Sequence, residues 1–154
     1  MKNQTVCFTG HRHIEPNEVE TVSQRLETVL VELIEKGYRY FGSGGALGFD
    51  LLAAQIVLNL KGKYPHIRLI LVLPCVDQTK FWNRSEIDYF EQIKRQADKV
   101  VCLAEKYYPG CMHRRNRHLV DNSSVCIAYL RKQSGGTFYT VEYAKAQKVR
   151  VIEL

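Results

Sequence analysis

Hydrophobic residues in this chain follow two alternating patterns. Between longer amphipathic segments lie six short stretches that are almost continuously apolar and rich in β-branched residues, as strands buried on both faces of a parallel sheet are. These stretches are TVCFTG (5–10), RYFGSG (39–44), IRLILVLP (67–74), KVVCLA (99–104), SVCIAYL (124–130) and VRVIEL (149–154).

The intervening segments predict helices, because their apolar residues recur at steps of three and four. Gly37 stands where the first helix should end. Residues 46–61 are apolar on nearly every side, which indicates a well-buried helix. In the third segment Ser85 and Asp88 have the spacing of a capping box. The helices are expected over about residues 16–36, 46–61, 80–97, 112–122 and 136–147.

Strands that alternate with helices predict a parallel sheet covered by helices on both faces. We therefore expect a Rossmann-like, doubly wound α/β fold of about six mostly parallel strands. An alternative is an α/β arrangement with one antiparallel edge strand. The chain has 154 residues, which suits one domain over residues 1–154 and is too short for an eight-fold barrel.

Composition narrows the class of protein. No apolar run is long enough to span a bilayer and the N-terminus has no signal-peptide pattern, so we expect a cytoplasmic protein with no membrane partner. The five cysteines include no CxxC pair, which favours reduced thiols. His11 and His13 form an isolated HxH, so we predict neither a metal nor a cofactor. The net charge of +6 suits nucleic acid and phosphate-bearing small molecules alike.

Polar and glycine-rich segments follow five of the predicted strands. In a parallel sheet the carboxyl ends of the strands lie at one edge, and ligands bind there. We therefore expect most of these segments to converge on one cleft. They are TGHRH, GSGGALGFD, PCVDQTKFW, EKYYPGCMHRRNRH and RKQSGGTFYT.

Two glycine turns, at 43–45 and 135–137, each lie between a strand and a helix. Glycine lets backbone N–H groups approach a ligand, and the first N–H groups of a helix carry partial positive charge. Both turns are therefore candidates for holding phosphate, with hydroxyl donors at Thr137 and Thr140. The alternative is structural: the glycines permit tight turns and the threonines cap the helix.

Charged and aromatic side chains complete the predicted site. Arg12 and Arg115 are candidates for phosphate contacts, although Arg12 also suits a surface ion pair. Asp50 either accepts from a ribose hydroxyl or complements the helix dipole. Trp82 either stacks on a base or fills the core. The predicted ligand-binding residues are Thr9, Gly10, His11, Arg12, Ser43, Gly44, Gly45, Asp50, Trp82, Arg115, Asn116, Gly135, Gly136, Thr137 and Thr140.

Taken together, these segments resemble a known superfamily. CFTGHR, GSGGALGFD, LVLPC with the following Gln and Phe-Trp, and MHRRNRHLVDNSSVCIAYLRKQSGGTFYTVEYA resemble the SLOG superfamily, in particular its YspA/YpsA-like group of small bacterial proteins. The resemblance covers nearly the whole chain. It implies a Rossmann-like fold that binds nucleotides or nucleotide-derived ligands. The superfamily also includes DNA-processing protein A, which binds single-stranded DNA, and the Lonely Guy phosphoribohydrolases, which cleave nucleoside monophosphates.

The hydrolase motifs MHxRK and PGGxGTxxE are only partly present. Met112, His113 and Arg115 match the first motif, in which Asn116 replaces the Lys. In the second, Thr140 stands about where the resemblance places the catalytic Glu. The next carboxylate lies two residues later, on a different side of a helix.

We therefore predict a protein that binds or senses a nucleotide-like small molecule without catalysis. A phosphoribohydrolase is the alternative. Single-stranded nucleic-acid binding ranks third, favoured by the charge and by Trp82. Because the related hydrolases assemble as dimers, the resemblance also implies a homodimer.

Overall fold

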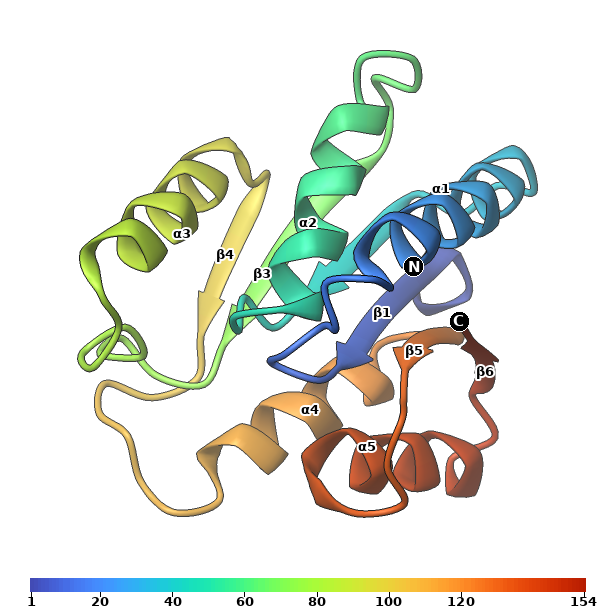
Figure 1. Ribbon diagram of the computed structural model, residues 1–154. Helices are drawn as coiled ribbons and strands as arrows, with labels where there is room; N and C mark the ends of the chain where they lie inside the picture. Colours follow the sequence, from blue (N-terminus) through green and yellow to red (C-terminus); the bar gives the residue numbers. More distant parts are fainter.

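The computed structural model describes residues 1–154. Six strands form one sheet in the order β4-β3-β2-β1-β5-β6 (Figure 1). Every neighbouring pair is parallel, so the predicted Rossmann-like α/β fold is confirmed and no antiparallel edge strand exists. A 3-10 turn, η1, precedes the sheet at Lys2–Gln4. The strands are β1 (Thr5–Gly10), β2 (Tyr40–Ser43), β3 (Arg68–Leu73), β4 (Lys99–Cys102), β5 (Val125–Tyr129) and β6 (Arg150–Glu153).

Helices cover both faces of the sheet (Figure 1). Three lie side by side on one face, and two pack together on the other. None is long and apolar enough to cross a membrane. The first group is α1 (Val19–Glu35), α2 (Phe49–Leu60) and α3 (Arg84–Gln96), and the second is α4 (Cys111–Asp121) and α5 (Gly135–Ala146).

The direction of winding reverses between β1 and β5. The first three crossovers add β2, β3 and β4 on one side of β1, and the fourth returns the chain to its other side. At such a point the loops that leave the two strands turn to opposite faces, which opens a crevice at the carboxyl edge. The fold thus places a ligand-sized opening after residues 10 and 129.

Two apolar layers hold the sheet between the helices. The larger contains 25 buried residues and packs α1, α2 and α3 on the sheet, and the smaller contains seven on the side of α4 and α5. Strand β1 serves both layers because its side chains alternate: Val6 and Phe8 belong to the larger layer and Cys7 to the smaller. The core therefore fixes both ends of β1, including the end that borders the crevice.

The helix ends show where local sequence signals were sufficient. Gly37, with a φ of +103°, ends α1 as predicted. The capping box of α3 differs from the expectation. The Asn83 side chain accepts from the Glu86 N–H and Glu86 Oε1 accepts from the Asn83 N–H, both at 2.9 Å, whereas Ser85 and Asp88 were expected. Asn and Ser are similarly good N-caps, so sequence alone did not separate the two registers.

Candidate functional site

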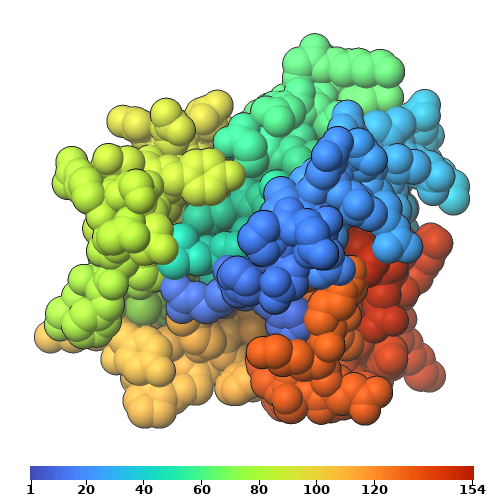
Figure 2. Space-filling view, in the orientation of Figure 1, coloured from blue at the N-terminus to red at the C-terminus, as the bar shows by residue number.

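A cavity of about 370 Å³ opens at the crevice between β1 and β5. Its lining comes from the loop after β1, the start of α2, one side of α4 and the loop that leads into α5. Figure 2 shows the blue N-terminal segment meeting the orange segments that follow β4 and β5 on this face. Only two of the 14 lining residues are hydrophobic, so the cavity suits a polar ligand.

Most residues predicted from the sequence line this cavity. They are Thr9, Gly10, His11, Arg12, Asp50, Arg115, Asn116, Gly135, Gly136 and Thr137. Ser43, Gly44, Gly45, Trp82 and Thr140 lie outside the lining. Four further residues line the cavity and were not predicted from the sequence: Ala46, Met112, Lys132 and Ser134. Helical spacing could have found Met112, because it precedes Arg115 by three residues and so shares its face of α4.

The first glycine turn lies behind two residues of the cavity lining, Asp50 and Arg115. The Gly45 N–H donates to Ser43 Oγ at 3.2 Å, and Arg115 Nη1 donates to the Gly44 carbonyl at 2.7 Å. A Cβ on Gly44 would lie 2.6 Å from Arg115 Nη1 and 2.8 Å from Asp50 Oδ2, so these side chains fill the space before the turn. Glycine at position 44 thus permits close packing of a buried Arg and Asp, and the phosphate contact at this turn stays a prediction.

The loop after β1 rests directly on the start of α2. Gly48 is the N-cap of α2 and has a φ of +83°. A Cβ on Gly48 would lie 2.2 Å from the Arg12 carbonyl oxygen, and the Phe49 N–H donates to the His11 carbonyl at 3.1 Å. These contacts hold His11 and Arg12 at the edge of the cavity, and only glycine at position 48 permits them.

The N-terminus of α5 opens into the cavity. Gly135, Gly136 and Thr137 are its first residues, and the N-cap Ser134 makes no side-chain hydrogen bond to them. A Cβ on Gly136 would meet no atom within 4 Å, so space remains beside these residues. Free N–H groups at a helix start favour an anion. Thr140 Oγ1 instead donates to the Gly136 carbonyl at 2.8 Å and serves the helix.

Two charged side chains lie buried in the cavity wall. Asp50 is 6% exposed and Arg115 is 5% exposed, yet they form no ion pair with each other or with any other residue. Arg115 Nε donates to Asn116 Oδ1 at 2.7 Å. Asp50 Oδ1 has no hydrogen-bond partner and is one of only two buried side-chain polar atoms in the protein without one. A buried acceptor left unpaired is costly, which marks Asp50 as a functional candidate.

The surroundings of Asp50 change its acidity. Burial raises the pKa of Asp50 from 3.8 to about 6, although the charges of Arg115 and Arg12 and the Ala46 N–H act in the opposite direction. Burial also lowers the pKa of Arg115, and the Asp50 charge opposes that change. Near neutral pH, Asp50 is therefore close to the point at which it exchanges a proton.

His11 lies at the same edge as a neutral ring. Burial lowers its pKa, and the charges of Lys132 and Arg131 lower it further. His11 Nε2 accepts a hydrogen bond from the Arg131 N–H at 2.8 Å, and the ring packs on Tyr129 at a centroid distance of 5.6 Å. The proton of the neutral ring is therefore on Nδ1. No group of three His, Cys, Asp or Glu residues lies close enough to hold a metal ion.

Trp82 lies in a second cavity of about 580 Å³ that adjoins the first. Arg12 and Met112 line both cavities. The Trp82 ring packs edge-on against Phe90 at 5.5 Å, and the Arg12 guanidinium lies 5.8 Å from its centre. Trp82 therefore packs against the core and also lines the cavity, and stacking on a base stays a prediction.

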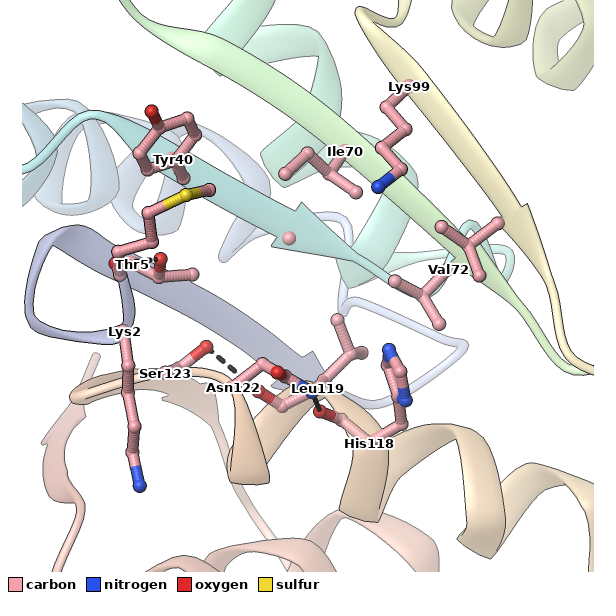
Figure 3. A pocket seen from close by; sticks show the side chains of 13 residues that line it. Lys2, Thr5, Tyr40, Ile70, Val72, Lys99, His118, Leu119, Asn122 and Ser123 are labelled. Atoms are coloured by element: carbon pink, nitrogen blue, oxygen red, sulfur yellow. Dashed lines mark hydrogen bonds between the residues drawn. The ribbon is translucent and has the colours of Figure 1, made fainter.

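A third cavity, of about 200 Å³, lies on a different part of the sheet (Figure 3). It lies over β2, β3 and β4, between α4 and the N-terminal residues, with Ile70, Val72 and Leu119 around it. Lys99 and His118 border it. None of the predicted ligand-binding residues lines this cavity, so it is separate from the candidate site.

Known bacterial proteins are similar to this chain over most of its length. The SPbeta prophage-derived protein YoqJ of Bacillus subtilis is 31% identical over 137 residues, which cover 80% of each chain. A UPF0398 protein of Bacillus cereus is 29% identical over 152 residues, covering 92% of this chain and 83% of its own.

Solved structures of DNA processing protein A share the fold. The protein from Helicobacter pylori, described for its single-stranded DNA binding mode, matches 99% of this chain with a TM-score of 0.71 and 22% identity. The protein from Streptococcus pneumoniae matches 99% with a TM-score of 0.71 and 19% identity. This chain spans only 65% and 50% of those two proteins. The sequence model of the YspA SLOG family matches residues 6–152, and the chain therefore belongs to the YspA SLOG family.

Proposed function

We propose that the cavity between β1 and β5 binds a nucleotide or a nucleotide-derived small molecule and catalyses no reaction on it. One observation carries the proposal: an uncapped helix N-terminus lines the same cavity as Asp50, whose Oδ1 is buried and unpaired. The N–H groups of residues 135–137 suit a phosphate. Asp50 Oδ1 suits a hydroxyl donor such as a ribose. A molecule that contains both a phosphate and a sugar satisfies both groups at once.

The charges around the cavity support an anionic ligand. Arg12 is exposed at its edge and pairs with no carboxylate, and Lys132 lines the opposite loop. Their positive charges act on the cavity interior, because Arg12 lowers the pKa of Asp50 and Lys132 lowers that of His11. The volume of about 370 Å³ is also in the range of small-molecule sites.

The proposal is tested by thermal shift and calorimetry with nucleosides and their mono-, di- and triphosphates. A ligand that binds only the folded protein raises its stability by about 2.7 kcal/mol at a concentration of 100 times Kd. Gly136→Ala places a methyl group in the open space beside the α5 N-terminus. We expect this variant to fold normally and to lose nucleotide affinity at least about tenfold, as when a charge-assisted hydrogen bond is removed.

Gly62→Ala is the matched control, since a Cβ on Gly62 meets only the Asn59 carbonyl at 3.5 Å, far from the cavity in the turn after α2. It should bind nucleotides like the wild type. Nucleosides that bind as tightly as nucleotides, or a Gly136→Ala variant with unchanged affinity, would contradict the phosphate site.

A phosphoribohydrolase is the second candidate, favoured by the raised pKa of Asp50. A carboxyl group with a pKa of about 6 can give or take a proton near neutral pH. The residues at and after the expected Glu position do not favour hydrolysis. The Thr140 hydroxyl donates to the Gly136 carbonyl, and the Glu142 side chain is exposed. The test is release of free base from nucleoside monophosphates. Release that Asp50→Asn abolishes would replace the binding proposal with an enzyme.

Single-stranded nucleic acid is the third candidate, favoured by the fold shared with DNA processing protein A. Fluorescence anisotropy with labelled oligonucleotides tests it, because strand binding weakens steeply with salt and needs a site of about 4–16 nucleotides. Sedimentation of the same samples tests the homodimer that the resemblance implies. Tight, salt-dependent binding of oligonucleotides but not of mononucleotides would favour this candidate.

A further inference from the structure

We propose that the second cavity, which contains Trp82, binds the base of the nucleotide through an aromatic surface and the Gln78 carbonyl. This inference rests on the proposed function of the first cavity and specifies its ligand further. The ligand class is a nucleotide whose base carries an N–H donor, as opposed to a sugar phosphate alone.

The two cavities differ in polarity as the two parts of a nucleotide do, the polar sugar phosphate and the flat base. Two of the 14 residues that line the first are hydrophobic, whereas five of the ten that line the second are. Arg12 and Met112 line both, so the cavities meet at these side chains. A phosphate and sugar held in the first cavity therefore direct an attached base toward the second.

Gln78 offers a hydrogen-bond acceptor of fixed orientation. Its Nε2 donates to the Gly45 carbonyl at 2.9 Å, which identifies the other amide atom as Oε1. Gln78 Oε1 is buried without a partner, and the only other such side-chain atom in the protein is Asp50 Oδ1. Each of the two adjoining cavities is thus lined by one of the two residues that carry a buried, unpaired acceptor. A base N–H or amino group would satisfy Gln78 as a sugar hydroxyl would satisfy Asp50.

Two aromatic side chains that line the second cavity are exposed to solvent and lie outside the apolar core. Phe81 is 91% exposed and Tyr107 is 60% exposed, and neither packs in the apolar core. Cations accompany the rings: Lys80 Nζ lies 5.5 Å from the centre of the Phe81 ring, as Arg12 lies over Trp82. Flat rings interleaved with cations are the usual means of stacking on a base.

Hydrogen bonds between two loops hold this surface in place. The Val76 N–H donates to the Ala104 carbonyl at 3.0 Å, and the Tyr107 N–H donates to Asp77 Oδ1 at 3.0 Å. The loop after β3 and the loop after β4 are thereby joined. The two loops that carry the aromatic side chains are therefore linked before any ligand arrives.

Trp82 provides a direct spectroscopic test, because it is the only tryptophan in the chain. The full-length protein is titrated with ribose 5-phosphate, with the four common nucleoside monophosphates and with purine riboside monophosphate, whose base has no N–H donor. Melting temperature and Trp82 fluorescence are both recorded, with free tryptophan as the control for absorption by the ligand. We expect all of these ligands to raise the melting temperature and only those with a base to quench Trp82. At least one common nucleotide should bind about tenfold tighter than ribose 5-phosphate and purine riboside monophosphate.

Two variants with a matched control locate the base. Phe81→Leu keeps an apolar side chain but removes the flat ring, and Phe81→Tyr keeps the ring. We expect Phe81→Leu to weaken nucleotide binding about tenfold, Phe81→Tyr to bind normally, and neither to alter ribose 5-phosphate binding. Gln78→Met keeps the side-chain length and removes the acceptor, so it should abolish the preference over purine riboside monophosphate.

The outcomes separate this inference from the function on which it rests. If no phosphate ligand raises the melting temperature, the proposed function and this inference both fail. If nucleotides and ribose 5-phosphate bind equally, with Trp82 unquenched and Phe81→Leu without effect, the base-binding cavity is refuted and the phosphate site stands. If Phe81→Leu weakens oligonucleotides but not mononucleotides, the surface serves a nucleic-acid strand and this inference is also refuted.

Discussion

Asp50→Asn should stabilise the ligand-free protein at alkaline pH. Burial raises the pKa of Asp50 from 3.8 to about 6 when the chain folds, and the attraction of Arg115 and Arg12 is already included in that value. Below about pH 3.8 Asp50 is protonated in both the folded and the unfolded chain, so its burial costs no charge. As the pH rises from 3.8 through 6, the unfolded chain loses this proton first, and the free energy of unfolding falls. The two pKa values differ by about two units, and each unit corresponds to 1.36 kcal/mol. Above pH 6 the buried charge therefore lowers the free energy of unfolding by about 3 kcal/mol. Asparagine has the same shape without the charge, so the variant gains about that amount at pH 8.

Urea and thermal denaturation at pH 8, 5 and 3.5 measure this gain. A gain of about 3 kcal/mol corresponds to a rise in Tm of about 6–12 °C for a domain of this size. The gain should be roughly half as large at pH 5 and close to zero at pH 3.5. Asp88→Asn, at an exposed carboxylate on α3, is the control and should change the stability by less than about 0.5 kcal/mol at any pH.

A variant that is less stable than the wild type at pH 8 would refute this reasoning, as would a gain that does not change with pH. The same substitution should weaken ligand binding, because it removes the carboxylate charge and replaces one of its two acceptor oxygens with an NH2 donor. Lower affinity combined with higher stability is typical of a residue retained for function.

Three other substitutions test the local geometry of the site and of its supporting helices. Gly48→Ala should lower the free energy of unfolding by about 3 kcal/mol or more in urea denaturation, because its Cβ would meet the Arg12 carbonyl at 2.2 Å, and Gly62→Ala should be nearly neutral. Asn83→Ala removes the capping box of α3 and should cost about 1 kcal/mol in the same assay, so an unchanged midpoint would contradict the cap. Arg115→Met removes a charge that lowers the pKa of Asp50, so NMR titration of that carboxyl should show a higher pKa; a decrease would contradict the charge arrangement.

The sequence was sufficient for the strands and for which loops meet at the carboxyl edge of the sheet. A strand covered on both faces must be apolar on both sides, so its local composition identifies it. The parallel order then brings the ends of β1 and β5 together, which is why Thr9–Arg12 and Gly135–Thr137 could be predicted to meet although they lie far apart in the chain.

The first glycine turn shows what the sequence could not provide. Glycines between a strand and a helix are expected both where a phosphate binds and where a side chain packs closely. At Gly44 the outcome depends on Arg115, which arrives from α4 and bonds the Gly44 carbonyl. No local pattern contains that contact. The orientation of Gln78 was hidden for the same reason, because it depends on a hydrogen bond to Gly45.

The central position of β1 also affects how the protein is made. This strand leaves the ribosome before the other five, but one of its two neighbours, β5, is formed by residues 125–129. Until those residues emerge, any sheet formed by the nascent chain has Val6–Gly10 as an open edge, with its N–H and C=O groups free to pair with another chain. Translational pausing before residue 125 therefore favours aggregation, and shielding of this edge by a chaperone protects the product.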